Sequence, residues 1–241
     1  MKEAALQIAD PQVRYMGTVG GNVANGDPAN DMPGLMQCLD ASFTLVGPNG
    51  TRTVTARTFY EAAYMTARED DEVLTEISFD AHAAGYAYEK QKRKIGDYAT
   101  AASAVLLSKD GGHCSSASIA MTNLSDTPIF SEAAGAALIG TQLDDAAIKQ
   151  AVTVALGDID PTEDNRGPVA FKMHVAGVIL TRDPSTVISD RLGMSCRSIR
   201  CGISAMRSFI IGIRLWPPAI TRASSPCSDK MATASAKAPG R

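Results

Sequence analysis

Residues 17–31 read GTVGGNVANGDPAND and hold four glycines, three asparagines and two aspartates. Such a segment is costly to order, because each glycine loses more conformational freedom on folding than any other residue. The pattern predicts a short extended segment that turns tightly at Gly20 and Gly21. Consecutive N–H groups in such a turn can form a concave site for a phosphate, with Thr18 and Asn22 as neutral donors at its rim. A glycine pair is equally typical of a purely structural loop.

Length and composition bound the class of protein. The chain has 241 residues, of which 45% are hydrophobic, enough for one large domain or two modest ones. We expect a cytoplasmic protein, because no run of about 18 apolar residues and no signal peptide is present. A formal charge of -3 argues against nucleic-acid binding. Five cysteines without CxxC spacing suggest neither a zinc site nor a disulfide framework, so any metal centre would lie on another chain.

The first third of the chain combines strand and helix signals. CLDASFTLVGPNGTRTV, residues 38–54, predicts a hairpin with GPNG as its turn. Apolar residues at Phe59, Ala62, Ala63 and Ala67 have helical spacing, and the following EVLTEISF has strand character. We therefore expect a mixed α and β unit up to about residue 80.

The middle of the chain predicts a sheet followed by helices. Residues 83–130 contain three β-like runs separated by KIGD, KDGG and NLSDTP, typical of an antiparallel meander. Ser131 and Asp144 are placed as the N-caps of two helices, and a third helix starts near Val169. Asp183 and Pro184 should end that third helix. This order of elements favours an α+β domain.

Residues 183–241 differ from the rest of the chain. They hold three of the five cysteines, the single tryptophan, and more arginine than acidic residues. Their apolar residues keep no sustained period, which predicts either a basic, partly disordered tail or unselected sequence such as a frameshift. We assign no function to them.

Three separated segments resemble one known family. RYMGTVGGNVANGDPANDMPGLM, YEKQKRKIGDYATAASAVLL and RGPVAFKMHVAGV occur in order and resemble the FAD-carrying subunits of the molybdenum hydroxylases, most closely the carbon monoxide dehydrogenase group, with xanthine dehydrogenases similar. The resemblance covers roughly residues 10–182.

The resemblance implies an α+β fold. Residues 1–82 would form the second subdomain of a vanillyl-alcohol-oxidase-type (PCMH-type) FAD-binding domain. Residues 83–182 would form a CO dehydrogenase flavoprotein C-terminal domain, a three-stranded antiparallel sheet plus helices, and 183–241 an atypical tail. The family's first FAD loop precedes everything in this chain, so we expect an N-terminally truncated fragment that binds FAD weakly.

The family's cofactor contacts are carried over position by position. By resemblance, the residues that contact FAD are Thr18, Val19, Gly20, Gly21 and Asn22 at the phosphates, Asp31 beside them, Leu74 along the flavin, and Lys90 and Asp97 near the isoalloxazine ring. A cation at Lys90 would stabilise reduced flavin. From the residues alone, Lys90 fits a solvated charge run, and Asp31 fits a helix cap.

The resemblance implies an electron-transfer subunit without catalytic or metal-binding residues of its own. It would take electrons from 2Fe-2S clusters on a small subunit and pass them through FAD to an external acceptor. A large subunit would hold the molybdenum cofactor, in a heterotrimer that dimerises. Two alternatives remain. One is a remnant that binds no flavin, and the other is a self-contained flavin oxidoreductase, which would need a substrate-binding cap domain that no segment offers.

Overall fold

The computed structural model describes residues 1–80 and 84–187. Four short helices open the chain: α1 (Lys2–Gln7), α2 (Pro11–Met16), α3 (Val19–Ala24) and α4 (Asp31–Cys38). The strands and 3-10 helix that follow are β1 (Ser42–Gly47), β2 (Gly50–Thr55), η1 (Ala56–Thr58), β3 (Tyr60–Ala62), β4 (Met65–Thr66) and β5 (Val73–Ser78). The remaining elements are β6 (Gly85–Gln91), β7 (Ala101–Asp110), β8 (His113–Thr122), β9 (Ile129–Phe130), α5 (Glu132–Leu138), α6 (Asp145–Gly157) and α7 (Val169–Thr186).

The hairpin predicted around GPNG is confirmed. β1 and β2 pair antiparallel with Gly47 opposite Gly50, and β5 pairs antiparallel with the other edge of β1. Gly50 has a φ of 118°, a backbone conformation that favours glycine, so the turn chemistry fixes the register.

The helix predicted from Phe59 to Ala67 is wrong. The segment instead forms η1 and the small antiparallel pair β3 and β4. Tyr64 at its turn has a φ of 62°, which no helix permits, and Ala63 is exposed. Phe59 is fully buried in edge-to-face contact with Phe43, so one aromatic anchor decides the local structure rather than a helical stripe.

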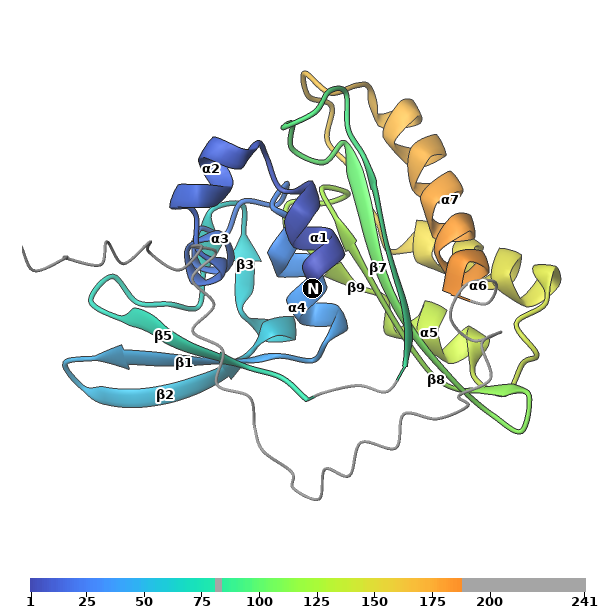
Figure 1. The fold of residues 1–241 in the computed structure, drawn as a ribbon, viewed down its shortest axis with the longest axis horizontal. Coiled ribbons are helices and arrows are strands. Elements are labelled where there is room, and N and C mark those ends of the chain that lie inside the picture. Colours follow the sequence, from blue (N-terminus) through green and yellow to red (C-terminus); the bar gives the residue numbers. More distant parts are fainter. Residues whose placement is uncertain (81–83, 188–241) are drawn as a thin grey trace, which may run out of the picture.

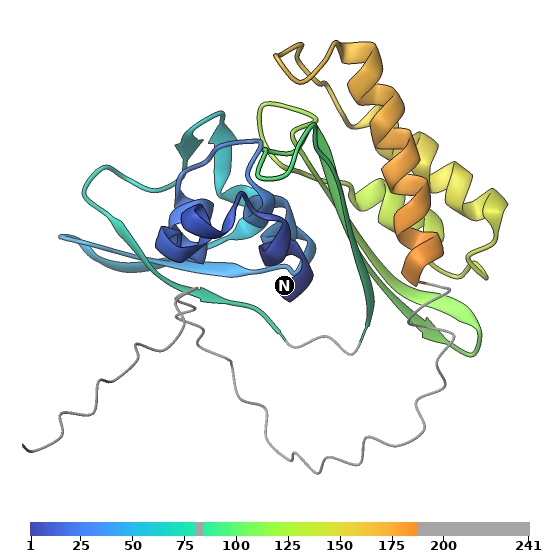
Figure 2. The same cartoon turned by 45° about the horizontal axis from the view of Figure 1, so that its top comes forward.

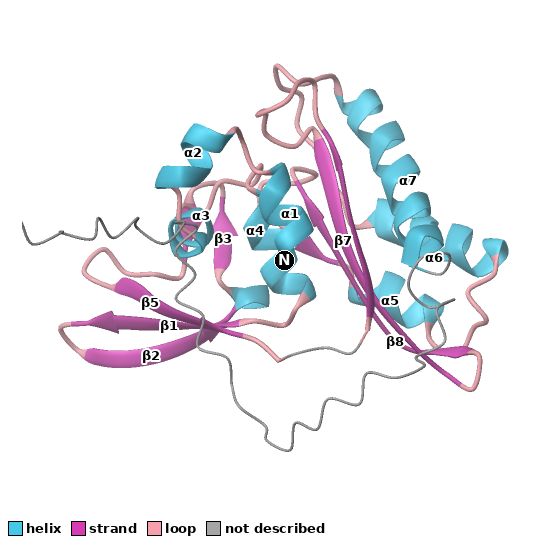
Figure 3. Ribbon diagram, in the orientation of Figure 1, coloured by secondary structure: helices cyan, strands magenta, loops and turns pink. Residues whose placement is uncertain are grey.

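The predicted antiparallel meander is confirmed, with a fourth short strand at its edge. The sheet has the order β6-β7-β8-β9, and Met121 of β8 pairs with Ile129 of β9. Helices α5, α6 and α7 cover one face of this sheet, and the unit that contains α1 and α4 lies against the other (Figures 1 and 2). The strands therefore lie between two helical layers, as the colouring by secondary structure shows (Figure 3).

Strand β7 is covered on both faces because the sheet lies between two layers. Its first five residues are all buried, whereas a strand with one solvated face would alternate. Small side chains there let helices approach closely. At Gly34 of α4, a Cβ would lie 2.3 Å from the Thr122 hydroxyl oxygen on β8, so only glycine fits this crossing.

The helix caps are as predicted, but the end of α7 is not. Ser131 accepts a hydrogen bond from the Ala134 N–H, and Asp144 accepts one from the Ala147 N–H. α7 continues through Pro184 to Thr186 instead of ending at residue 182. Tertiary contacts hold it there, because Asp183 is buried and accepts a hydrogen bond from Ser103 of β7.

Two hydrophobic clusters form the core of residues 1–80 and 84–187. One contains residues of β7, β8 and α5–α7, and the other contains residues of α3, α4, β1 and β5 together with Ala104 and Ala120 of the larger sheet. No helix in the described part of the chain combines the length and the apolar character of a membrane span. The tail is predicted for residues 183–241; its start is wrong, because α7 runs to Thr186 and both Asp183 and Val187 are buried, while residues 188–241 lie outside the described part of the chain.

Candidate functional site

The glycine-rich segment forms a helix start rather than an open turn. Thr18 is the N-cap of α3, and its Oγ1 accepts a hydrogen bond from the Gly21 N–H at 2.9 Å. Within residues 17–31, Gly26 alone has a positive φ, so the predicted turn at Gly20 and Gly21 is wrong. A threonine at this position begins a helix because it satisfies a first-turn N–H. The N–H groups of Val19 and Gly20, at the first two helical positions, have no intrahelical acceptor.

Gly21 also has a steric reason to be glycine. A Cβ at this position would lie 3.0 Å from the Thr18 Oγ1, closer than side chains normally come. At Gly20 a Cβ would meet Leu74 at an ordinary 3.6 Å. The capping bond therefore explains why residue 21 is glycine. The packing around residue 20 would accommodate a Cβ.

Asn22 links this helix start to α4. Its side-chain Oδ1 accepts from the Met32 N–H at 3.1 Å, and its backbone carbonyl accepts from the Asn30 Nδ2 at 3.0 Å. The Asn22 Nδ2 is not used in either bond. The two bonds fix α3 against the start of α4 and leave a donor group beside the cavities described below.

A buried charge pair joins the two halves of the chain. The Lys90 Nζ on β6 lies 2.8 Å from the Asp31 Oδ2 on α4, with 1% and 5% of the side chains exposed. The same ammonium donates to the Gln7 carbonyl oxygen at 3.3 Å, and the Tyr88 hydroxyl donates to the other oxygen of Asp31. Burial, and then the charge of Asp31, raise the pKa of Tyr88 well above its ordinary value, so this phenol stays a donor.

This arrangement revises the electrostatic expectation for Lys90. The solvated charge run suggested by its neighbours does not describe it, because its side chain is buried. Its positive charge is matched by Asp31, so the pair is close to neutral. Lys90 therefore offers a directed N–H donor rather than an unbalanced cation.

Two cavities adjoin these residues. Their lining is largely apolar but includes amide, hydroxyl and charged side chains, and they are called the polar cavities below. The larger, about 360 Å³, is lined by Ile8, Val13, Arg14, Met16, Gly17, Thr18, Val19, Gly21, Asn22, Asn25, Asn30 and Met32. The smaller, about 190 Å³, is lined by Ile8, Ala9, Val13, Asn22, Asn30, Asp31, Lys90, Gly96, Asp97 and Tyr98. Because they share four lining residues, they form one continuous donor-rich region with a single cation, Arg14, in the larger cavity.

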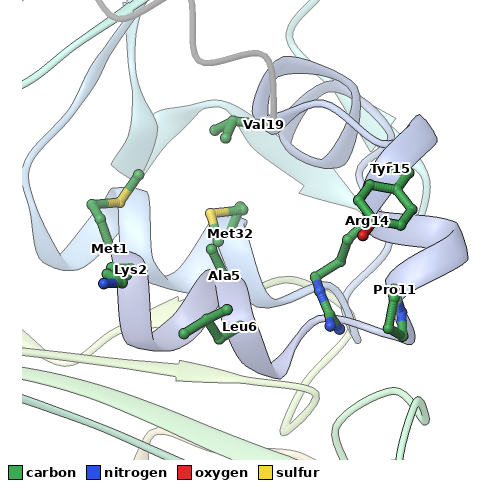
Figure 4. Close-up of a pocket in the computed structure, with 9 residues that line it drawn as sticks. All are labelled: Met1, Lys2, Ala5, Leu6, Pro11, Arg14, Tyr15, Val19 and Met32. Carbon is green, nitrogen blue, oxygen red and sulfur yellow. The ribbon is translucent and has the colours of Figure 1, made fainter. Parts of the chain in front are cut away.

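A third, mainly apolar cavity is lined by residues of α1 and α2 together with Val19 of α3 and Met32 of α4. It measures about 550 Å³, and Arg14, Val19 and Met32 line both it and the larger polar cavity. Figure 4 shows Met32 in the middle of the lining residues, Val19 above it, and Tyr15 and Pro11 on the α2 side. Lys2 and Arg14 line it but no asparagine or threonine of the described chain does, so the region formed by the two polar cavities offers more amide and hydroxyl donors to a ligand.

Asp97 lies in the loop between β6 and β7. Arg93 donates to its carboxylate at 2.9 Å, and this bond lowers the pKa of Asp97. The other carboxylate oxygen accepts from the Tyr98 N–H. Asp97 thus fixes the conformation of the loop that closes the smaller cavity.

The structure gathers most of the residues singled out from the sequence. Those that line one or both polar cavities are Thr18, Val19, Gly21, Asn22, Asp31, Lys90 and Asp97. Gly20 and Leu74 are not among the described residues that line them. Leu74 is half-buried in the core behind α3, with its Cδ2 facing Gly20.

Sequence reasoning missed several lining residues. They are Ile8, Ala9, Val13, Arg14, Asn25 and Asn30. The asparagines stand within the glycine-rich segment, and their amide groups were a signal for ligand binding. Ile8, Ala9 and Val13 carry no such signal, because their apolar side chains are of a common type and only the folded chain brings them to the cavities.

Comparison with known proteins gives two family matches. Residues 1–79 match the FAD binding domain in molybdopterin dehydrogenase, and residues 86–183 match the CO dehydrogenase flavoprotein C-terminal domain. Together the two matches cover nearly all of the described residues.

Individual relatives agree with these matches. The carbon monoxide dehydrogenase medium chain of Afipia carboxidovorans is 54% identical over 184 residues, which are 76% of this chain and 64% of the relative. The glyceraldehyde dehydrogenase medium chain of Sulfolobus acidocaldarius is 32% identical over 74% of this chain and 64% of the relative. The chain thus spans less than two thirds of these relatives.

Solved structures show the same fold. A structure of reconstituted CO dehydrogenase from Oligotropha carboxidovorans superposes with a TM-score of 0.75 at 54% identity, covering 76% of this chain and 65% of that one. Quinoline 2-oxidoreductase from Pseudomonas putida gives a TM-score of 0.73 at 29% identity, covering 77% and 65%. The α+β architecture is shared across this identity range.

Proposed function

We propose that this chain, which belongs to the flavoprotein family defined by the FAD-binding domain of molybdopterin dehydrogenases and the CO dehydrogenase flavoprotein C-terminal domain, binds FAD and transfers electrons through it. The observation that carries the proposal is the donor-rich region beside the N-terminus of α3. Its hydroxyl, amide and N–H groups fit a ligand with many acceptor oxygens, as a pyrophosphate has, and Arg14 adds positive charge.

We assign the site residues as follows. Thr18, Val19, Gly20, Gly21 and Asn22 would contact the phosphates with Asp31 beside them, and Leu74 would lie along the flavin. Lys90 and Asp97 would lie near the isoalloxazine ring. The division of the chain into residues 1–82 and 83–182 is part of the same proposal and is supported by the two family matches.

Bound FAD would accept and release electrons, since that chemistry belongs to the cofactor. The chain would orient it and shape its surroundings. Asn22 holds α3 and α4 together while offering its Nδ2, and the Lys90 Nζ donates a hydrogen bond to the carboxylate of Asp31. The neutral pair adds a directed donor without adding net charge.

We further propose that the chain is one subunit of a larger oxidoreductase acting in the cytoplasm. Relatives whose names describe medium chains or FAD subunits support this assignment. A large molybdenum-binding subunit and a small 2Fe-2S subunit would supply the electrons. Carbon monoxide is the first substrate to test, given the 54% identity to a carbon monoxide dehydrogenase medium chain.

The test is FAD titration of the purified 241-residue chain, followed by quenching of flavin fluorescence. Asn22→Asp keeps the oxygen that accepts from Met32 but replaces the Nδ2 donor by negative charge, so FAD should bind at least roughly tenfold more weakly. Asn49→Asp, in the exposed turn of the β1–β2 hairpin, makes the same change away from the cavities and should have no effect. A wild-type chain that binds no FAD, or equal affinities for wild type and Asn22→Asp, would contradict the proposal.

A further inference from the structure

Three consecutive backbone carbonyls at the end of α1 accept hydrogen bonds from positively charged side chains. The Gln7 oxygen accepts from the Lys90 Nζ at 3.3 Å. The Ile8 and Ala9 oxygens accept from the same Arg14 nitrogen, Nη1, at 2.7 and 2.9 Å. The last carbonyls of a helix lack intrahelical partners and favour cations, so these bonds stabilise the end of α1.

The residues that follow α1 form a constrained turn. Residues 8–10, here called the α1–α2 turn, place Ala9 at a φ of 41°, which is uncommon for a residue other than glycine. The two carbonyls bound by Arg14 belong to the peptide groups on either side of the Ala9 Cα. One guanidinium therefore bridges both peptides and restricts the rotation of Ala9 between them.

The α1–α2 turn is also the wall between the cavities. Ile8 lines both polar cavities, and Ala9 lines the smaller one. Arg14 lines the larger polar cavity and the apolar cavity, and Figure 4 shows its side chain extending from α2 toward the connection with α1. A displacement of this turn would alter both polar cavities at once.

We propose that Arg14 is a positioning residue of the flavin site: by binding the two carbonyls that flank Ala9, it fixes the wall that the two polar cavities share. The proposal rests on the proposed FAD function. It assigns to Arg14 a role through the α1–α2 turn, in addition to the positive charge that it presents to the larger cavity.

The chain contains a matched control for this role. The Arg68 Nη1 also donates to two backbone carbonyls, those of Glu69 and Glu72, at 2.7 and 3.0 Å. Its loop precedes β5 and lies outside the described lining of all three cavities. Arg14→Gln and Arg68→Gln therefore remove the same kind of bridge, once beside the site and once away from it.

The experiment combines hydrogen exchange by mass spectrometry with FAD titration of the full chain. Arg14→Gln should speed exchange in peptides covering residues 8–13 and weaken FAD binding, each by roughly tenfold or more, because charge-assisted bonds are lost. Arg68→Gln should change neither, even if both variants lower the melting temperature equally. Arg14→Lys should restore any affinity that depends on charge alone, while exchange at the turn stays fast.

Hydrogen exchange tests the role of Arg14 in the α1–α2 turn, and FAD affinity tests its role in the flavin site. Wild-type exchange at residues 8–13 in Arg14→Gln would overturn the role of Arg14 in the turn. Faster exchange with unchanged FAD affinity would overturn its role in the flavin site. A wild-type chain that binds no FAD would refute the proposed function, while the exchange comparison would still decide whether Arg14 holds the turn.

Discussion

Replacing Lys90 by methionine should destabilise the protein strongly. Methionine keeps most of the unbranched apolar stem but removes the ammonium that lies 2.8 Å from Asp31. Asp31 would then be a buried carboxylate whose remaining side-chain donor in the described structure is Tyr88. Removing one partner of a buried ion pair costs about 3–5 kcal/mol. For a chain of this size that predicts a fall in melting temperature of roughly 6–20 °C.

The reasoning is tested by a double-mutant cycle measured by urea unfolding. Asp31→Asn with Lys90→Met removes both charges, and the asparagine oxygen can still accept from Tyr88. The double variant should therefore lose less stability than the sum of the single variants, by about 2 kcal/mol or more. Arg52→Met, which breaks the surface pair between Arg52 and Glu72, should have a smaller effect than Lys90→Met. Additive losses, or single-variant losses under about 1 kcal/mol, would refute the description of a coupled buried pair.

Two further predictions concern the core. Gly34→Ala should lower the free energy of unfolding by about 1–3 kcal/mol, because its Cβ would meet the Thr122 hydroxyl, and adding Thr122→Ala should recover part of that loss in urea unfolding. Gly157→Ala, with nothing near its Cβ, is the control. Equal losses of stability for Gly34→Ala and Gly157→Ala would contradict the steric explanation. Burial raises the pKa of Asp183 well above its ordinary value, so its contribution to stability is fully present below about pH 4 and is lost as pH rises. Asp183→Asn, which can still accept from Ser103, should therefore gain melting temperature relative to wild type between pH 4.5 and pH 8, and a difference that stays constant with pH would show that the carboxyl is not perturbed.

Local signals predicted the elements that depend on nearby residues. The GPNG turn fixed the β1–β2 hairpin because its glycines allow the turn geometry. Ser131 and Asp144 marked two helix starts because each side chain satisfies a first-turn N–H. In these cases the physical cause lies within a few residues of the element.

The errors arose where distant contacts decide the structure. The spacing from Phe59 to Ala67 is helical, but the contact between Phe59 and Phe43 outweighs it. Pro184 does not end α7, because Asp183 is held by Ser103 on a strand 80 residues earlier. Contacts between residues so far apart cannot be predicted from the neighbouring sequence.

In the candidate site too, some features follow from local sequence and others depend on contacts between distant residues. Thr18, Asn22 and Asp31 stand close together in one segment, so the sequence predicts that they act together, and each lines at least one of the two polar cavities. Lys90 carries a charge that the sequence shows, but its burial against Asp31, 59 residues away, depends on the packing of β6 onto α4. The role of Arg14 could not be predicted, because its acceptors are backbone carbonyls, which every residue possesses.

Ala104 and Ala120 of the larger sheet pack into the hydrophobic cluster of the N-terminal unit, and this limits how the two units can be exchanged between proteins. Both residues belong to the C-terminal family match, yet their side chains complete the hydrophobic cluster of the N-terminal one. Natural recombination or deliberate chimera building that joins the two matched regions from different relatives would place a foreign sheet surface beneath α4, against residues as tightly fitted as Gly34. The boundary visible in sequence families is thus a poor place to exchange parts, and viable hybrids should inherit α4 and the strands β7 and β8 from the same parent.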